Sequence, residues 1–252
     1  MARKAALVTG AARRIGLAIA ERLAGAGYDV AIHASDATRP EAEEAAARLQ
    51  AQGHKAVVIA AELSDPAQPA HIVGAAKAAL GPLSVLVNNA SIFERDSADA
   101  IDVALFDKLM AVNLRAPLLL AQHFANQVPD GTPALIVNLV DQRVWRPTPQ
   151  FFSYSVTKAG LWWATQTMAQ AFAPRHIRVN AVGPGPVLPN TPQGDAGFEK
   201  EVAGVLLKRA VAPAEIADAV LFLVQAQSVT GQMIAVDSGQ HLAWQTPDIP
   251  EV

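Results

Sequence analysis

Tyr154 and Lys158 are the two residues of this 252-residue sequence whose types and spacing best suit proton transfer. They stand four positions apart, so on a helix their side chains lie on one face. Tyrosine titrates at about pH 10 in water, and a neighbouring ammonium group favours the phenolate form. The spacing therefore predicts a tyrosine that exchanges a proton with a bound molecule and a lysine that lowers the pKa of Tyr154.

A second constellation, the glycine turn, has the sequence TGAARRIG over residues 9–16. It follows an apolar run and precedes a stretch with helical spacing, which is the context of a phosphate-binding turn. Gly10 permits the tight turn, Gly16 permits close packing, and backbone N–H groups at the start of the helix face a pyrophosphate. We therefore expect a dinucleotide at this turn.

Short apolar runs, apolar on both faces as buried parallel strands are, recur between stretches of helical spacing such as Ile15, Ile19 and Leu23. The runs cover residues 5–8, 30–32, 56–60, 85–87, 134–137, 177–182 and 233–236. Alternating strands and helices with long crossovers predict an α/β fold, a Rossmann-type doubly wound parallel sheet of about seven strands with helices on both faces. Ligands of such sheets bind at the carboxyl ends of the strands.

Nothing in the sequence divides the chain, because it has no repeat, no low-complexity tract and no linker rich in glycine or serine. We expect a single domain over residues 1–252. One irregular stretch, residues 183–197, contains four prolines at positions 184, 186, 189 and 192. This stretch is expected to be an active-site lid or loop.

Composition excludes several kinds of function. Hydrophobic residues make up 51% of the chain, charged residues 17%, and the formal net charge is −3, so neither disorder nor a nucleic-acid-binding surface is indicated. The chain has no cysteine, which excludes disulfides, thiolate nucleophiles and cysteine-ligated zinc. Its six histidines lack the spacing of a helical zinc site, so they are interpreted as surface or core residues, and no metal is expected.

Targeting signals are also missing from the sequence. Residues 1–4 lead directly into the first apolar run, without the charged leader and cleavage site of a signal peptide. No apolar run reaches the roughly 18 residues that would span a bilayer. A cytoplasmic location without membrane partners is the expectation.

The position that separates NAD(H) users from NADP(H) users is Ala34, at the end of the second expected strand. NAD users place an acidic residue there, which binds the ribose 2′-hydroxyl and repels a 2′-phosphate. Asp36 is interpreted as a solvent-facing turn or helix-entry residue. Three arginines lie near this corner in the sequence: Arg13, Arg14 and Arg39. Charge therefore favours NADP(H) over NAD(H).

These motifs resemble the short-chain dehydrogenase/reductase family, and the resemblance covers nearly the whole chain. It comprises, in order, the glycine turn, residues 88–90, Asn113, Tyr154 with Lys158, residues 184–185 and residues 237–239. It implies that Tyr154 is the proton donor, that Lys158 also binds the nicotinamide ribose, and that Asn113 holds a proton-relay water. It further implies a homotetramer.

The resemblance also implies which residues contact NADPH. The expected cofactor contacts are Gly10, Arg13, Arg14, Ile15, Ser35, Leu63, Asn89, Ala90, Ser91, Tyr154, Lys158, Pro184 and Gly185. Two positions depart from the family pattern. Arg14 replaces the middle glycine of the turn, and Asp141 stands thirteen residues before Tyr154, where the family has a serine. Arginine cannot provide the close backbone approach of glycine, but its guanidinium suits the pyrophosphate or the substrate.

Asp141 changes the chemistry expected of the site, because a serine hydroxyl donates to a carbonyl oxygen whereas an ionised carboxylate only accepts. Asp141 suits a substrate with N–H groups, or one in which a ring nitrogen receives the proton. Arg14, Asp141 and the sequence NASIF over residues 89–93 together resemble the pteridine reductases and related bacterial dihydropteridine reductases. That resemblance implies that Phe93 stacks the pterin over the nicotinamide and that Ser91 contacts cofactor and substrate. It places Asp141 in catalysis with Tyr154 and Lys158, and Arg14 on phosphate and pterin.

Three functions remain open from the sequence. The first is an NADPH-dependent reductase of pterins, and the second is a short-chain reductase of small ketones or quinones. The third is a catalytically silent protein that binds NADP(H) as a sensor or partner subunit. Intact Tyr154, Lys158 and Asn113 favour the two enzymes.

Overall fold

The computed structural model describes residues 4–189 and 194–244. Its strands form one seven-stranded sheet in the order β3-β2-β1-β4-β5-β6-β7, and every pairing is parallel. The strands are β1 (Lys4–Val8), β2 (Tyr28–Ala34), β3 (Ala56–Ala60), β4 (Leu83–Asn88), β5 (Ala134–Leu139), β6 (Ile177–Pro184) and β7 (Met233–Val236). All seven predicted strands are confirmed, and so is the Rossmann-type architecture.

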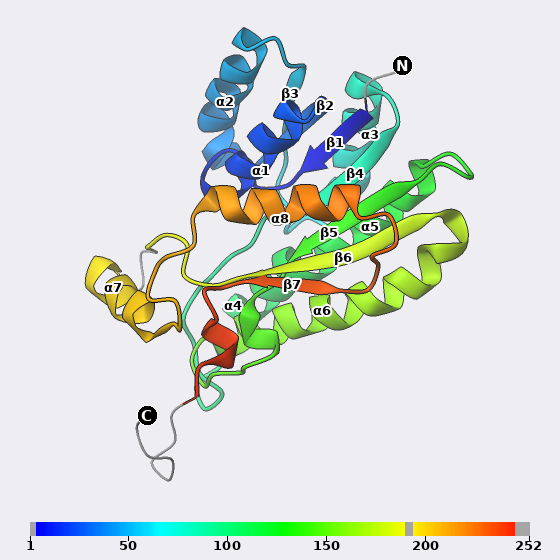
Figure 1. Ribbon diagram of the computed structural model, residues 1–252. Helices are drawn as coiled ribbons and strands as arrows, with labels where there is room; N and C mark the ends of the chain where they lie inside the picture. Colours follow the sequence, from blue (N-terminus) through cyan, green and yellow to red (C-terminus); the bar gives the residue numbers. More distant parts are fainter. Residues whose placement is uncertain (1–3, 190–193, 245–252) are drawn as a thin grey trace.

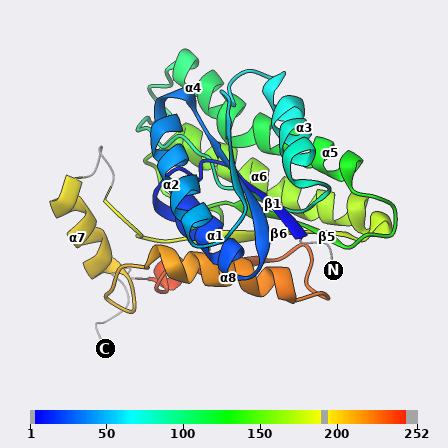
Figure 2. The ribbon, with the colours of Figure 1, turned by 90° about the horizontal axis from the view of Figure 1, so that it is seen from above.

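Helices cover both faces of this sheet (Figures 1 and 2). The helices are α1 (Arg14–Gly25), α2 (Arg39–Ala51), α3 (Gln68–Leu80), α4 (Val103–Leu109), α5 (Ala116–Gln127), α6 (Phe152–Phe172), α7 (Gly194–Gly204) and α8 (Pro213–Gln225). Helices α1, α2 and α8 pack on one face, and α3, α5 and α6 pack on the other. Helix α7 lies apart from both layers, at the edge where β6 ends.

The alternation of side chains along β1 shows why its sequence is apolar at every position. Ala6 and Val8 belong to the core under α1, α2 and α8, whereas Ala5 and Leu7 belong to the core under α3 and α5. All four residues are fully buried. Burial of a side chain such as Leu7 contributes about 2 kcal/mol, so both helix layers are held to the sheet by the same short strands.

The strand order brings the segments that follow four of the strands together at the carboxyl edge of the sheet. Because all strands are parallel, the carboxyl ends of β1, β4, β5 and β6 meet there, and the order reverses between β1 and β4. The expected loop over residues 183–197 is partly wrong. Strand β6 continues through Pro184, and residues from Gly194 onward already belong to α7. Residues 190–193 lie outside the described part of the chain.

No helix within the described ranges combines the length and apolar character needed to cross a membrane.

Candidate active site

A cavity of about 900 Å³ opens at the carboxyl edge of the sheet. Every cofactor and substrate contact expected from the sequence lines it, from Gly10 in the glycine turn to Gly185 after β6. Asp141, Tyr154 and Lys158 line it as well. Asn113 is the one expected site residue that does not, since it is fully buried behind the wall. Segments far apart in the sequence therefore build a single site.

The glycine turn lies against the residues that follow β4. Gly10 has a backbone φ of +60°, and a Cβ atom there would lie 2.9 Å from the Cα of Ala90. A Cβ atom on Gly16 would collide with the Gly10 carbonyl oxygen and come within 2.5 Å of Asn89 Nδ2. Asn89 Nδ2 donates to the carbonyl oxygens of Thr9 at 2.8 Å and Gly10 at 3.0 Å. These contacts require both glycines and hold the turn in the shape that a pyrophosphate needs.

Arg14 has left-handed backbone at the position where the family has the middle glycine of the turn. Its φ of +54° is the left-handed conformation that glycine adopts readily and that costs other residues roughly 1 to 2 kcal/mol. Its guanidinium donates to the carbonyl oxygens of Pro189 at 3.0 Å and Leu188 at 3.3 Å. Arg14 therefore links the glycine turn to the segment after β6, and its side chain lines the cavity from that position.

His33 is a supporting residue that the sequence did not single out. The Gly10 N–H donates to His33 Nδ1 at 3.2 Å, and Nε2 lies 3.2 Å from the Ala61 carbonyl oxygen. Since Nδ1 accepts, Nε2 carries the proton and donates to Ala61. Burial lowers the pKa of His33 to about 4. A neutral imidazole therefore ties the glycine turn to the ends of β2 and β3.

The corner at the end of β2 carries hydroxyl groups in place of an acid. Ala34 is buried, and the hydroxyls of Ser35 and Thr38 lie 3.1 Å apart, both residues lining the cavity. Asp36 is exposed at the start of a short 3₁₀ helix, which confirms its interpretation as a helix-entry residue. Arg39 does not line the cavity, and its guanidinium pairs with Glu43 at 2.8 Å.

Arg13 is the remaining cation of this corner. It lines the cavity, and its Nη1 lies 3.6 Å from a carboxylate oxygen of Glu41. The Arg13 side chain is 64% exposed, so this ion pair is weak and leaves the guanidinium available to a bound anion. The corner therefore offers one exposed cation and two hydroxyls to a phosphate group.

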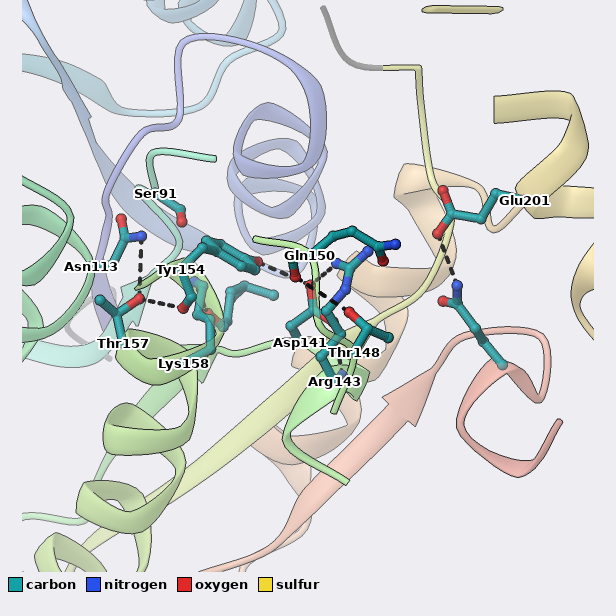
Figure 3. A network of polar contacts seen from close by, with 12 residues as sticks. Ser91, Asn113, Asp141, Arg143, Thr148, Gln150, Tyr154, Thr157, Lys158 and Glu201 are labelled. Atoms are coloured by element: carbon teal, nitrogen blue, oxygen red, sulfur yellow. Dashed lines mark hydrogen bonds and ion pairs between the residues drawn. The ribbon is translucent and has the colours of Figure 1, made fainter. Parts of the chain in front are cut away.

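Tyr154 occupies the centre of the site, in the first turn of α6, with Lys158 one turn further as the spacing predicted. Its hydroxyl donates to Asp141 Oδ2 at 3.0 Å, just after β5 (Figure 3). Burial first, and then the Asp141 carboxylate, raise the pKa of Tyr154 well above its ordinary value, while Arg143 lowers it. This corrects the expectation of a lowered tyrosine pKa, because burial disfavours the phenolate and the charge beside the hydroxyl is a carboxylate.

Lys158 contacts the backbone and not the tyrosine hydroxyl. Its Nζ donates to the Leu139 carbonyl oxygen at 2.8 Å and lies 5.6 Å from the centre of the Tyr154 ring. Burial lowers the pKa of Lys158 to about 8, and the Asp141 carboxylate partly offsets that effect. Lys158 therefore carries its charge at neutral pH and loses it as the pH rises through about 8.

Arg143 and Phe151 complete the substrate end, and neither was singled out from the sequence. Arg143 pairs with Asp141 and lines the cavity beside Phe151. The rings of Phe93 and Phe151 stack with centroids 4.2 Å apart, and Phe93 meets Tyr154 edge-on at 4.7 Å. Phe151 has a φ of +57°, the second non-glycine residue of the cavity wall with left-handed backbone. Strain of this kind is concentrated at functional sites.

Asn113 lies in a six-residue π-helix (Met110–Arg115) between α4 and α5. Its side chain accepts from the N–H of Ile92 and donates to the carbonyl oxygen of Ile92, both at 2.8 Å. It also donates to the Thr157 hydroxyl at 3.4 Å, so it holds the segment before Phe93 against α6. A relay-water role for Asn113 stays a prediction. π-Helical turns of this kind are frequent at functional sites.

Metal ligands do not gather in the described ranges, where no group of three histidine, aspartate or glutamate side chains is placed to hold an ion.

Comparisons with known proteins agree with this geometry. A family profile described as enoyl-(acyl carrier protein) reductase matches residues 10–241. A short-chain dehydrogenase/reductase of Armillaria gallica is 36% identical over 251 residues, covering 94% of this chain and 95% of the relative.

Two solved structures are similar over nearly their whole length. FolM alternative dihydrofolate reductase 1 of Brucella canis, complexed with NADP, is 46% identical, with a TM-score of 0.94 and coverage of 99% and 98% of the two chains. A short-chain dehydrogenase of Burkholderia cenocepacia in complex with NADP is 33% identical, with a TM-score of 0.88 and coverage of 94% and 97%. With its sheet, its glycine turn and its Tyr154–Lys158 pair, the chain belongs to the short-chain dehydrogenase/reductase family.

Proposed function

We propose that this protein is an NADPH-dependent reductase that transfers a hydride to a ring carbon of a C=N bond in a dihydropteridine. The observation that carries the proposal is the bond from the Tyr154 hydroxyl to Asp141, at the position where the family has a serine. An ionised carboxylate accepts hydrogen bonds, so it suits the N–H groups of a pterin and repels the developing alkoxide of a ketone. Similarity to the Brucella FolM protein supports the same substrate class.

NADPH fits the cofactor end of the cavity. The glycine turn lines the cavity at the start of α1, where backbone N–H groups suit a pyrophosphate, and Ser35, Thr38 and Arg13 suit a ribose 2′-phosphate. When bound, NADPH supplies the hydride. We expect NADPH to bind at least tenfold more tightly than NADH, a difference of about 1.4 kcal/mol. Fluorescence titration of both nucleotides tests this, and equal dissociation constants would contradict it.

Tyr154 supplies the proton in this proposal. Its raised pKa keeps the hydroxyl protonated until a ring nitrogen gains electron density from the arriving hydride. Phe93 offers a flat apolar wall beside the hydroxyl, against which a pterin ring can stack. In the same proposal Asp141 accepts from ring N–H groups, and the Lys158 ammonium binds the nicotinamide ribose, as the family resemblance implies.

A substrate panel separates this function from the alternatives. NADPH oxidation is followed with dihydrobiopterin, dihydrofolate, a quinone and a small ketone. Turnover of the dihydropteridines with little turnover of the ketone is the expected result. Preference for the ketone or quinone favours a short-chain reductase of small ketones or quinones. NADPH binding without turnover of any compound favours a silent binding protein.

A homotetramer is part of the same proposal. Helix α6 exposes large apolar side chains next to the site: Val156 is 40% exposed and Trp163 is 70% exposed. Single apolar residues are ordinary on a surface, but two on one helix suit helix packing between subunits. Light scattering at micromolar concentration measures the mass, and a monomer there would contradict the proposal.

A further inference from the structure

The pairing of Tyr154 with Asp141 creates an electrostatic difficulty. The Tyr154 hydroxyl lies 3.0 Å from the carboxylate oxygen that it contacts, and both side chains are nearly buried. When the tyrosine gives up its proton, a phenolate forms beside a carboxylate, away from most of the surrounding water. Two like charges this close oppose ionisation strongly in a medium of low dielectric constant. A serine at position 141 would not cause this difficulty, so the aspartate requires a compensating cation.

Arg143 is placed to provide that cation. Its backbone N–H donates to Asp141 Oδ1 at 2.9 Å, and its Nη1 donates to Asp141 Oδ2 at 3.1 Å. Oδ2 is the same oxygen that accepts from the Tyr154 hydroxyl. The side chains of Arg143 and Asp141 are 17% and 12% exposed, so solvent screens the pair little. Arg143 thus contacts both carboxylate oxygens and fixes the orientation of the one that faces Tyr154 (Figure 3).

The guanidinium is itself held by the aromatic wall. Its central carbon lies 5.5 Å from the centroids of both Phe93 and Phe151, whose nearly parallel rings are 4.2 Å apart. The guanidinium therefore lies within cation–π distance of both rings, which helps to hold it beside Asp141. Its Nε is buried and has no hydrogen-bond partner in the described part of the chain.

Other charged groups also lie around Asp141 and Arg143. Lys158 on α6 interacts with Asp141 through its charge. Further charged residues line the same cavity, among them Arg14, Arg95, Lys108 and Glu201. Within residues 4–189 and 194–244, Arg143 is the side chain that forms an ion pair with Asp141. The compensation is therefore assigned to Arg143, with Lys158 as a more distant second cation.

We infer that Arg143 is a positioning residue of the reaction, which orients the Asp141 carboxylate and offsets the negative charge left on Tyr154 after proton transfer. This inference rests on the proposed function for its chemical step. In that step the Tyr154 O–H bond breaks and the proton forms an N–H bond on the ring nitrogen. The hydride forms a C–H bond at the adjacent carbon, the C=N bond is reduced by two electrons, and the nicotinamide is oxidised. The resulting phenolate lies beside Asp141, with Arg143 on the other side of the carboxylate.

The kinetic test compares Arg143→Gln and Arg143→Lys with Arg146→Gln. Arg146 is the matched control, because it lies on the same segment, is exposed, donates to the Gln240 carbonyl oxygen and does not line the cavity. Arg143→Gln should lower kcat at least about tenfold and move the acid limb of kcat/KM to higher pH by about one unit, with unchanged NADPH affinity. Arg143→Lys should restore the pH profile, and Arg146→Gln should keep that of the parent. A parent-like kcat and profile in Arg143→Gln would overturn the inference.

A second test needs no substrate, so it stands even if the proposed function fails. Thermal stability is measured for the parent, Arg143→Gln, Asp141→Asn and the double variant at about pH 7. If Arg143 compensates the charge of Asp141, most of the loss of Tm in Arg143→Gln should disappear when Asp141→Asn is already present. A loss of Tm that simply adds to that of Asp141→Asn would show a role independent of this charge, and that result would overturn the inference.

Discussion

At one end of the cavity, His33 and Asn89 hold the glycine turn through neutral hydrogen bonds, whereas at the other end Asp141 and Arg143 surround Tyr154 with buried charge. The cofactor end depends on close backbone contact, because a Cβ atom on Gly16 has no space. The substrate end depends on which groups are ionised. Substitutions should therefore damage the two ends in different ways. The cofactor end is sensitive to a steric clash at the glycine turn and to protonation of His33. The substrate end is sensitive to loss of the charges of Asp141 and Arg143 or of the Tyr154 proton.

Tyr154→Phe should have the largest effect, because it removes the proton of the substrate end and leaves the cofactor end intact. Turnover should fall by roughly 10²-fold or more, the usual size of a general-acid contribution. NADPH affinity, measured by fluorescence titration, should stay within about twofold of the parent, since the ring and its packing are kept. Parent-like turnover would show that Tyr154 is not the proton donor.

Asp141→Asn comes next, since it keeps the shape and one acceptor but removes the charge. Dihydropteridine turnover should fall by about 10²-fold. Asp141→Ser restores the hydroxyl typical of the family, so it should leave dihydropteridine reduction poor and raise the turnover of simple ketones. If Asp141→Asn reduces a dihydropteridine as well as the parent does, the residue is only a cap of the short 3₁₀ helix that follows it.

His33 makes the cofactor end sensitive to acid. In the unfolded chain a histidine titrates at about pH 6.5, and in the folded protein burial lowers the pKa of His33 to about 4. Neutral His33 therefore makes its full contribution to the free energy of unfolding above about pH 6.5. That contribution is lost as the pH falls from there toward about 4, because the histidine of the unfolded chain binds a proton before that of the folded chain. Between about pH 7 and pH 5 the loss should be about 2 kcal/mol.

His33→Asn removes this titration and keeps an acceptor for the Gly10 N–H. Urea unfolding at several pH values should show a shallower acid dependence for His33→Asn than for the parent. His71→Gln on the exposed face of α3 is the control, and its acid dependence should match that of the parent. Identical slopes in His33→Asn and the parent would contradict the neutral His33 of this structure.

Gly16→Ala tests whether the cofactor end depends on close contact at the glycine turn, and its expected effect on free energy is smaller than those above. The added Cβ would displace Asn89 and the Gly10 carbonyl oxygen, so NADPH affinity should fall at least about tenfold, or about 1.4 kcal/mol. Gly74→Ala is the matched control, because nothing lies within 4 Å of a Cβ atom at that position on α3. It should leave NADPH affinity unchanged and stabilise the helix by about 0.5–1 kcal/mol.

Much of the fold follows from local patterns. Each strand is apolar at consecutive positions because it is buried on both faces, and that requirement is visible in seven short segments. The four-residue spacing of Tyr154 and Lys158 reflects the helix turn itself, so it places both on one face of α6 wherever that helix packs. The absence of an acid at Ala34 is equally local. These features need no knowledge of which strands are neighbours.

Contacts across the sheet edge were decided by the tertiary structure. The bond of His33 to Gly10 depends on the pairing of β1 with β2, and the stacking of Phe151 on Phe93 joins two segments that are far apart in the sequence. The direction of the Tyr154 pKa shift depends first on the burial of the hydroxyl and then on the Asp141 carboxylate beside it, and the folded chain sets both.

Arg143 shows which information is visible in the sequence and which depends on the tertiary structure. Its position two residues after Asp141 is visible in the sequence and could have flagged a compensating charge. Sequence spacing alone, however, does not tell whether two side chains on a loop meet or point apart, because a loop has no fixed period. The turn after β5 brings the guanidinium to the carboxylate and leaves both side chains mostly out of the solvent. The spacing of residues thus determined the strands, the helices and the Tyr154–Lys158 pair. The folded chain decided which charges share the site, because the interaction of charges depends on distance and burial and not on order along the chain.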